Sequence, residues 1–306
     1  MSGRESFLMT SILILKLLAF VVLIVLAVSL YGALETIRVP FLGIPATPSD
    51  YGLDYEKVQF STIRNVELTG WWIPADRPSP VTIIIQHGVG SNAGDMLPSS
   101  LCLRNDGAWN LFYYNFRGHG DSGGLHTSIG PLELEDMRHA VAFIKKRWPK
   151  ATKRLGLYGH SLGAAVALVG AAEMKEIEGV IAENSFSDVR RTIRRFAWIF
   201  YHVPYYPFIP VALLMASIQM RVWIGRFSPE KHIGKIAPRP VLLLHGELDR
   251  RMPKSDVRAL WDAAREPKEL WTIPMAGHGD AWLVVKDEYE RRLVDFFKAI
   301  FGGKTV

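Results

Sequence analysis

A serine flanked by glycines is the residue whose surroundings point most directly to chemistry. Gly159, Ser161 and Gly163 lie in the pentapeptide GHSLG, which has the G-x-S-x-G form of a nucleophile elbow. A strand is expected before it, from Arg154 to Tyr158, and a helix after it, from Leu162 to Met174. A serine on such a turn adopts strained backbone angles, and the glycines avoid collisions with the strand and helix. The pattern predicts an exposed nucleophile; a helix-capping serine is the alternative.

Two residues downstream have the types and positions of a general base and its acidic partner. A serine hydroxyl is a weak nucleophile until a base takes its proton, and the base needs a partner that fixes its tautomer. In a strand–turn–helix architecture the chain order is nucleophile, acid, base. Asp249 in HGELDRRMP is the candidate acid, with Glu247 as the fallback, and His278 in AGHGD is the candidate base. We therefore expect Ser161, Asp249 and His278 to form a catalytic triad.

Two backbone amides are candidates for an oxyanion hole. The Leu162 amide lies at the start of the helix behind the serine, where the helix dipole is positive. The Val89 amide lies in HGVG, directly after a predicted strand, with a glycine on each side that lets the backbone approach a substrate closely. His87 in the same loop is expected to hydrogen-bond its own loop rather than to react.

A glycine-rich turn, FRGHGDSGG from residue 116 to 124, superficially suggests phosphate binding. It lacks the lysine and the strand-to-helix spacing of a P-loop. We therefore expect this turn to brace the structure.

The elements that must position these residues alternate along the chain. Short runs rich in apolar residues alternate with helical patterns, which is typical of a mostly parallel sheet covered by helices on both faces. An antiparallel pair turning at Arg64 and Asn65 comes first. The predicted strands are 58–63, 66–73, 81–86, 111–116, 155–159, 179–185, 241–246 and 269–274, and the predicted helices are 132–148, 161–174, 255–266 and 287–300.

The segment from residue 188 to 232 interrupts this alternation and is expected to form a helical cap over the carboxyl edge of the sheet. It begins with an arginine cluster, from Arg190 to Arg195, that could contact anionic headgroups or form a solvated helix face. It continues with aromatic residues, broken by prolines, that either contact a substrate or only pack against the domain beneath. The candidate substrate-binding residues are Phe196, Trp198, Tyr201, Tyr205 and Trp223.

The N-terminal part explains why mean hydropathy is slightly positive in an otherwise ordinary charged protein. Residues 17–34, LLAFVVLIVLAVSLYGAL, carry no charge and as a helix span about 27 Å, close to a bilayer core of about 30 Å. We expect residues 1–34 to be an uncleaved transmembrane anchor, with a cleaved signal peptide as the alternative. Arg4 and Lys16 precede the span, so the positive-inside rule predicts a cytoplasmic N-terminus and a non-cytoplasmic bulk. Residues 35–57 are a predicted linker and residues 58–306 a single catalytic domain.

Composition and charge exclude several classes of protein. With 306 residues, 49% of them hydrophobic, the chain is neither a disordered tail nor a small disulfide-rich scaffold. A net charge of +6 is a mild excess, so no nucleic-acid partner is expected. The single Cys102 means that the domain relies on its core rather than on disulfides. The histidines and carboxylates lack metal-ligand spacing, so no metal or other cofactor is expected. No oligomeric state is predicted.

Taken in order, the motifs HGVG, NFRGHGDSGG, GHSLG, HGELD and GHGD resemble those of α/β-hydrolase fold proteins of the serine hydrolase type, over roughly residues 58 to 300. The chain is most similar to the membrane-anchored Bem46-like branch. The resemblance implies an α/β-hydrolase fold, Ser161 as nucleophile, Asp249 as acid, His278 as base, and Val89 and Leu162 as oxyanion amides.

The leading functional hypothesis is a membrane-anchored carboxylic ester hydrolase acting on small-molecule or lipid esters with apolar acyl groups. It would proceed through an acyl-enzyme, as Ser–His–Asp hydrolases do. A thioesterase or a serine peptidase is the alternative within enzymes, because the triad does not distinguish these bonds. A non-catalytic membrane scaffold that kept the fold is the alternative from another class.

Overall fold

The computed structural model describes residues 3–40 and 42–302, and an eight-stranded sheet forms its centre. The strand order is β1-β2-β4-β3-β5-β6-β7-β8. β1 and β2 form an antiparallel hairpin, β2 also pairs antiparallel with β4, and all remaining pairs are parallel. The strands are β1 (Glu56–Thr62), β2 (Val66–Ile73), β3 (Val81–Gln86), β4 (Asn110–Tyr114), β5 (Arg154–His160), β6 (Ile177–Glu183), β7 (Val241–Gly246) and β8 (Lys268–Ile273).

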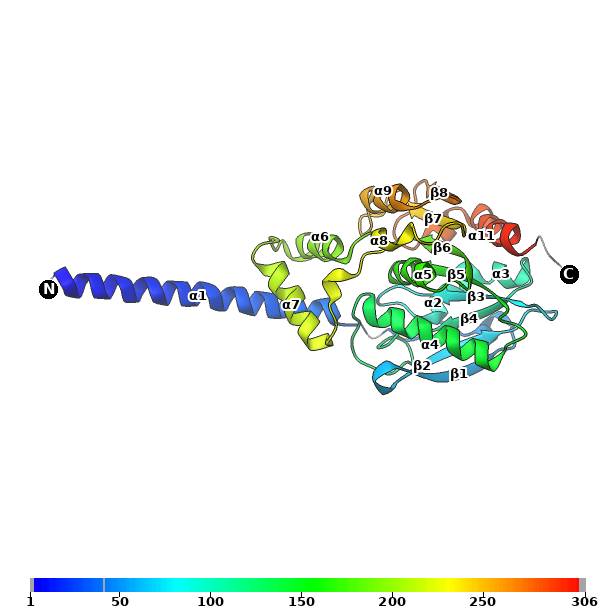
Figure 1. Cartoon of the computed structure of the whole chain (residues 1–306), viewed down its shortest axis with the longest axis horizontal. Coiled ribbons are helices and arrows are strands. Elements are labelled where there is room, and N and C mark those ends of the chain that lie inside the picture. Colours follow the sequence, from blue (N-terminus) through cyan, green and yellow to red (C-terminus); the bar gives the residue numbers. More distant parts are fainter. Residues whose placement is uncertain (1–2, 41, 303–306) are drawn as a thin grey trace.

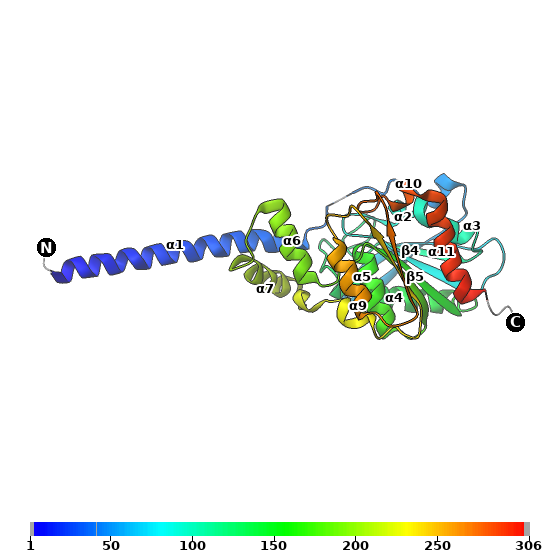
Figure 2. The ribbon, with the colours of Figure 1, turned by 90° about the horizontal axis from the view of Figure 1, so that it is seen from above.

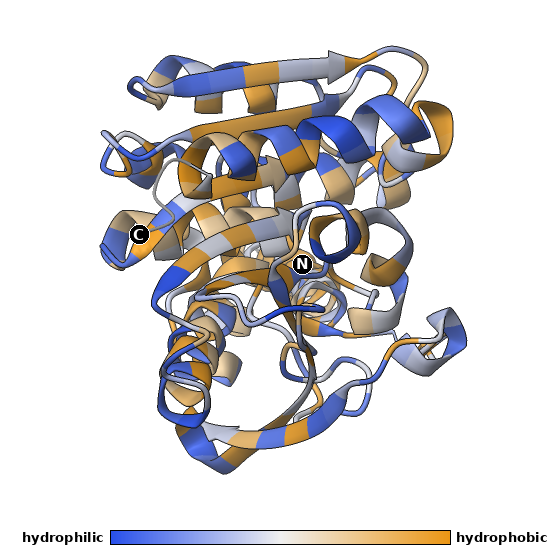
Figure 3. Cartoon of the chain, turned by 90° about the vertical axis from the view of Figure 1, so that its right-hand side faces the viewer, coloured by the Kyte–Doolittle hydropathy of each residue, from blue (hydrophilic) through white to orange (hydrophobic). Residues whose placement is uncertain are grey.

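All eight predicted strands are present, within two residues of the expected ends. The central strands β3, β4 and β7 are buried at every residue, whereas the edge strand β1 alternates between buried and exposed residues. A strand covered on both faces needs apolar side chains throughout, and an edge strand covered on one face needs them only at every second position. In Figure 3 strands in the middle of the view carry long apolar segments, whereas the lowest strand alternates between hydrophilic and hydrophobic residues.

Helices cover both faces of the sheet and enclose two hydrophobic clusters. The first cluster lies under α4 (Pro131–Arg147), α5 (Leu162–Glu173) and α9 (Lys254–Ala263). The second lies under α2 (Ala93–Ser100), α3 (Cys102–Asn105), α10 (Ala281–Val284) and α11 (Lys286–Phe301). Figure 2 shows α4, α5 and α9 on the side of the sheet opposite α3 and α11. Along β3, Ile84 belongs to the first cluster and Ile83 and Ile85 to the second, as the two-residue period of a strand requires.

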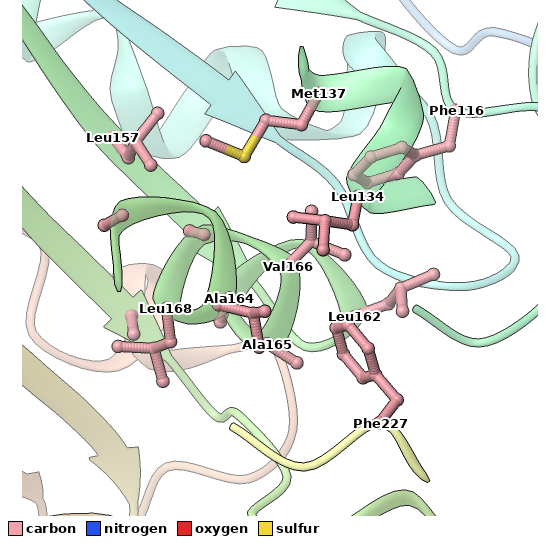
Figure 4. Packing of buried hydrophobic residues seen from close by; sticks show 14 of the residues in the cluster. Phe116, Leu134, Met137, Leu157, Leu162, Ala164, Ala165, Val166, Leu168 and Phe227 are labelled. Carbon is pink, nitrogen blue, oxygen red and sulfur yellow. The ribbon is translucent and has the colours of Figure 1, made fainter. Parts of the chain in front are cut away.

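The helix α5 behind the serine is buried along almost its whole length. Its small residues allow close packing: a Cβ at Gly170 would lie 2.4 Å from Met137 Sδ on α4. Figure 4 shows Ala164, Ala165 and Val166 of α5 among Leu134, Met137 and Phe116. This packing holds the start of α5, and therefore Ser161, at a fixed place above the sheet.

The N-terminal helix α1 (Gly3–Ile37) projects from the domain as a single long rod (Figure 1). It is longer than the predicted span of residues 17–34, and Ser6–Ile37 is, within the described residues, the one helix long and apolar enough to cross a membrane. Residues 1–2, 41 and 303–306 of the predicted anchor, linker and domain lie outside the described residues.

Two helices between β6 and β7 form the predicted cap, α6 (Val189–Tyr201) and α7 (Phe208–Met220). They lie beside the C-terminal part of α1 in both views (Figures 1 and 2). The cap is completed by the 3-10 helix η3 (Ile224–Arg226) and by α8 (Glu230–Ile233).

Candidate active site

Ser161 occupies the sharp turn between β5 and α5. Its backbone angles, φ 55° and ψ −114°, are strained for a residue with a side chain. The two glycines are required by close backbone contacts: a Cβ at Gly159 would lie 2.4 Å from the Gly163 carbonyl, and one at Gly163 would lie 2.3 Å from the Gln86 oxygen. The turn therefore has the geometry of a nucleophile elbow.

A continuous hydrogen-bonded chain joins Ser161, His278 and Asp249. The His278 Nε2 lies 3.1 Å from the Ser161 hydroxyl oxygen. The His278 Nδ1 lies 2.7 Å from Asp249 Oδ2, to which it donates, since an ionised carboxylate only accepts. This arrangement leaves Nε2 free to take the serine proton, which is the function of a general base in a triad.

Asp249 is held in place by its own loop. The backbone amides of Arg251 and Met252 donate to its second oxygen at 2.8 and 2.9 Å. Burial by itself would raise the pKa of Asp249, but the hydrogen bond from His278 and the electrostatic attraction between the two groups, together with these two amides, hold it below the ordinary value. Asp249 therefore remains ionised and can orient the imidazole.

The alternative acid, Glu247, makes a different contact. It lies on the same loop, but its carboxylate pairs with Lys254 at 3.2 Å, with both side chains partly exposed. Asp249 rather than Glu247 is therefore the acid that contacts the base.

The serine opens into a cavity of about 270 Å³. One oxyanion candidate, Val89, lines this cavity. The other, Leu162, directly follows Ser161 as the first residue of α5. The loop approaches the serine so closely that a Cβ on Gly88 would lie 3.0 Å from Ser161 Cβ. The lining residues are Gly88, Val89, Gly90, Ser91, Asp95, Met96, Ser99, Tyr158, His160, Ser161, Glu183, Arg251, His278, Gly279, Trp282 and Tyr289.

Comparisons with known proteins show the family to which the chain belongs. A family model described as serine aminopeptidase, S33, matches residues 78–211. The chain is 30% identical over 253 residues to the uncharacterized protein YfhR of Escherichia coli K12, covering 79% of this chain and 80% of YfhR. It is 27% identical over 257 residues to the protein bem46 of Schizosaccharomyces pombe, covering 82% and 79%. An esterase from Pyrococcus furiosus superposes with a TM-score of 0.73 at 28% identity, over 87% of this chain and 99% of the esterase.

The chain belongs to the α/β-hydrolase family. Its eight-stranded, mostly parallel sheet and its nucleophile elbow between β5 and α5 are the structural features that this membership explains. The chain is accordingly a hydrolase.

One feature of this α/β-hydrolase that sequence reasoning missed is a polar network in the cavity wall. Glu183, at the end of β6, is fully buried and accepts hydrogen bonds from Tyr158 (2.7 Å) and Tyr289 (2.6 Å) on the same oxygen. Burial raises the pKa of Glu183, and the two tyrosine hydroxyls oppose that shift. In the sequence, Glu183 stands at the carboxyl end of an apolar strand, next to the positions that the triad loops occupy, and that position was the available signal.

His160, next to the serine, is a second residue without an assigned role. Its ring lies 5.0 Å from that of His278, and its Nε2 is buried without a hydrogen-bond partner among the described residues. Burial, followed by the repulsion of His278, lowers the pKa of His160 to about 3. His160 is therefore neutral wherever the enzyme is folded near neutral pH.

The glycine-rich turn after β4 braces the α/β-hydrolase core, as predicted. Arg117 forms a buried bidentate pair with Asp136 on α4, at 2.9 Å to Oδ2 and 2.5 Å to Oδ1. His87 also follows its prediction, because Nδ1 contacts the Gly88 carbonyl at 2.8 Å and Nε2 accepts from the Phe116 amide at 3.0 Å. These contacts tie the loop that carries Val89 to the loop after β4.

The five aromatic residues predicted to bind substrate lie outside the cavity lining. Phe196 packs partly buried against the first cluster, and Trp198 is 59% exposed. Tyr201 packs against Tyr31 of α1. The other two contact arginines: Tyr205 lies under Arg194, and Trp223 lies under Arg226. Their prediction as substrate-binding residues rested on the cap covering the serine, whereas the described cap extends sideways along α1.

Proposed function

We propose that this hydrolase is a membrane-anchored serine hydrolase that cleaves carboxylic esters through an acyl-enzyme. The observation that carries the proposal is the unbroken contact from Ser161 through His278 to Asp249 at the wall of a cavity. Ser161 would attack the acyl carbon while His278 takes its proton and returns it to the leaving group. Water would then release the acyl group by the same route.

The oxyanion formed in each step needs donors that are already in place. The amides of Val89 and Leu162 are our candidates, because both residues adjoin the serine and one begins a helix. Loss of a single such donor typically costs about 10²–10³ in kcat.

The scissile bond is proposed to be an ester. The similarity to an esterase from Pyrococcus furiosus supports this choice over a thioesterase. The family model described as serine aminopeptidase keeps a peptidase as the alternative. The preference for apolar acyl groups came from the cap aromatics and remains a prediction, since the cavity itself has mainly polar walls, such as Ser99, His160 and Glu183.

A fluorophosphonate probe tests the catalytic proposal. The wild-type protein should be labelled, and Ser161→Ala should abolish both labelling and ester hydrolysis. Ser99→Ala is the matched control, because Ser99 lines the same cavity and should leave labelling intact. Equal labelling of the Ser161→Ala protein, or an unlabelled but folded wild-type protein, would contradict the proposal. With active protein, p-nitrophenyl esters of increasing chain length, alongside acyl-thioesters, would define the substrate class.

The anchoring proposal rests on α1, which is long and apolar enough to cross a membrane and whose most apolar part is not buried against the domain. We expect the full chain to resist alkaline carbonate extraction from membranes. Release into the supernatant would contradict the anchor. The predicted non-cytoplasmic side is tested with protease added to sealed vesicles whose cytoplasmic face is outward. The chain around residue 150 should then be protected from cleavage.

A further inference from the structure

The C-terminal part of α1 packs against the cap. The Ser29 hydroxyl donates to the Phe208 carbonyl of α7 at 3.1 Å. The rings of Tyr31 and Tyr201 pack edge to face at 5.9 Å. On the face turned to α7, a Cβ on Gly32 would lie only 3.6 Å from Ala212 Cβ. The cap therefore holds a fixed position along the helix, at residues 29 to 32.

The charges on α1 indicate where these contacts between α1 and the cap lie relative to a bilayer. Lys16 and Glu35 bound an uncharged stretch of eighteen residues, about 27 Å of helix and close to the thickness of a hydrocarbon core. If this stretch fills the core, its last residue, Leu34, marks the boundary. Ser29 then lies about 7.5 Å inside that boundary. The cap residues that contact Ser29 and Tyr31 must lie at the same depth.

The cap has the composition that this depth requires. From residue 196 to 220 it contains no Asp, Glu, Lys or Arg. Several of its large apolar side chains are exposed although they belong to a packed domain. The cap helices lie beside α1 (Figures 1 and 2), whose apolar side chains are also exposed. An apolar surface this extensive marks a contact site rather than ordinary exposure. Its members are Trp198, Ile199, Phe200, Tyr206, Leu214 and Ile218.

The charged end of α6 faces the domain and not the apolar surface. Arg195 pairs with the buried carboxylate of Asp256, and Arg191 pairs with Glu230. Two arginines of the cluster thus hold α6 onto the domain. The apolar C-terminal end of α6 extends away from the domain. A helix with this polarity suits the boundary between headgroups and acyl chains.

We propose that the α6–α7 cap is immersed in the bilayer interface beside α1, so that the protein contacts lipid through two elements. This inference rests on the proposed membrane anchor. The immersion depth of about 7.5 Å matches the 5–10 Å typical of interfacial helices.

Immersion would also bring the cavity to the headgroup layer. Pro40 follows the last residue of α1 by three positions and contacts Gly90, which lines the cavity: a Cβ on Gly90 would lie 3.4 Å from Pro40 Cγ. Three residues of extended chain reach about 10 Å. An ester carried by a lipid would therefore need to rise only a short distance from the membrane to reach the site.

Depth-dependent fluorescence quenching tests the proposal on the full chain in phosphatidylcholine vesicles. In a Cys102→Ala background, an environment-sensitive NBD label is placed at Phe200→Cys and Ile218→Cys on the cap. Leu23→Cys on α1 reports the anchor, and the exposed Lys150→Cys, at the opposite end of the strands, is the control. Thermal unfolding midpoints establish that each protein is folded.

We expect quenching by doxyl-labelled lipid at positions 200, 218 and 23, and none at 150. Quenching at 23 without quenching at 200 and 218 would overturn the immersed cap and leave the anchor intact. Absence of quenching at 23 would instead reject the anchor. Emission at 200 and 218 that shifts with protein-to-lipid ratio but is not quenched would identify a second copy of the chain as the occupant, and would also overturn the proposal.

Discussion

The His278 Nε2 lies 3.1 Å from the Ser161 hydroxyl oxygen although 117 residues separate them along the chain. One residue follows β5 and the other follows β8, which lie three strands apart in the sheet. The contact forms because parallel strands bring their carboxyl ends to one edge, where the loops meet. Asp249 and the glycines around Ser161 hold the two side chains in this contact.

Substitution of each candidate acid should show that Asp249, and not Glu247, is the acid of the triad. Asp249→Asn keeps the shape of the side chain but removes the acceptor that orients His278, so kcat should fall by about 10⁴. Glu247→Gln should change kcat by less than about threefold, because this residue pairs only with the exposed Lys254. Steady-state hydrolysis of a p-nitrophenyl ester measures both. A larger loss in Glu247→Gln than in Asp249→Asn would reverse the assignment.

A methyl group at the elbow should be destabilising. Gly159→Ala would place Cβ 2.4 Å from the Gly163 carbonyl, and overpacking of this kind costs about 1–3 kcal/mol or more. Gly43→Ala is the matched control, since a Cβ there meets nothing within 4 Å. Thermal unfolding in detergent should show a lowered midpoint for the first variant only. Equal midpoints would mean that the elbow tolerates a side chain at this position.

Breaking the buried pair in the glycine-rich turn should cost more than removing it entirely. Arg117→Ala leaves the Asp136 carboxylate, which is fully buried, without its partner, and a loss of about 3–5 kcal/mol is typical. The double variant Arg117→Met with Asp136→Leu removes both charges and should recover much of that loss. Denaturant midpoints compare the three proteins. A double variant less stable than Arg117→Ala would contradict the desolvation argument.

Acid should destabilise the protein in part through His160. The pKa of His160 is about 3 in the folded protein against an ordinary value of 6.5, so between these values the unfolded chain binds one more proton than the folded chain. Stability then falls as pH drops below 6.5, by about 1.4 kcal/mol per unit and about 2 kcal/mol at pH 5 for this residue.

The variant His160→Phe keeps a ring at this position and removes the proton. We expect the free energy of unfolding, measured in detergent between pH 5 and 7.5, to depend less steeply on pH in the variant. Below pH 6.5 the difference in slope should correspond to about one bound proton. Parallel pH profiles for the two proteins would show that His160 does not titrate on unfolding.

The sequence by itself determined the strands, the elbow and the order of its partners. The central strands are apolar throughout because helices cover both of their faces, and this pattern is visible without a structure. The role of the glycines around Ser161 could likewise be predicted, because close backbone contacts at that turn admit no other residue. Asp249 and His278 could be predicted as partners of Ser161 because loops after parallel strands converge at one edge of the sheet.

Only the tertiary structure decided which side chains meet across elements that are distant in sequence. Glu183, Tyr158 and Tyr289 come from β6, β5 and α11, and no local pattern relates them. The place of the cap was decided in the same way. Its aromatic composition suits a substrate pocket and a membrane contact equally, because hydrophobic burial is non-directional. The packing of Tyr201 on Tyr31 and the hydrogen bond from the Ser29 hydroxyl to the Phe208 carbonyl set the cap beside α1.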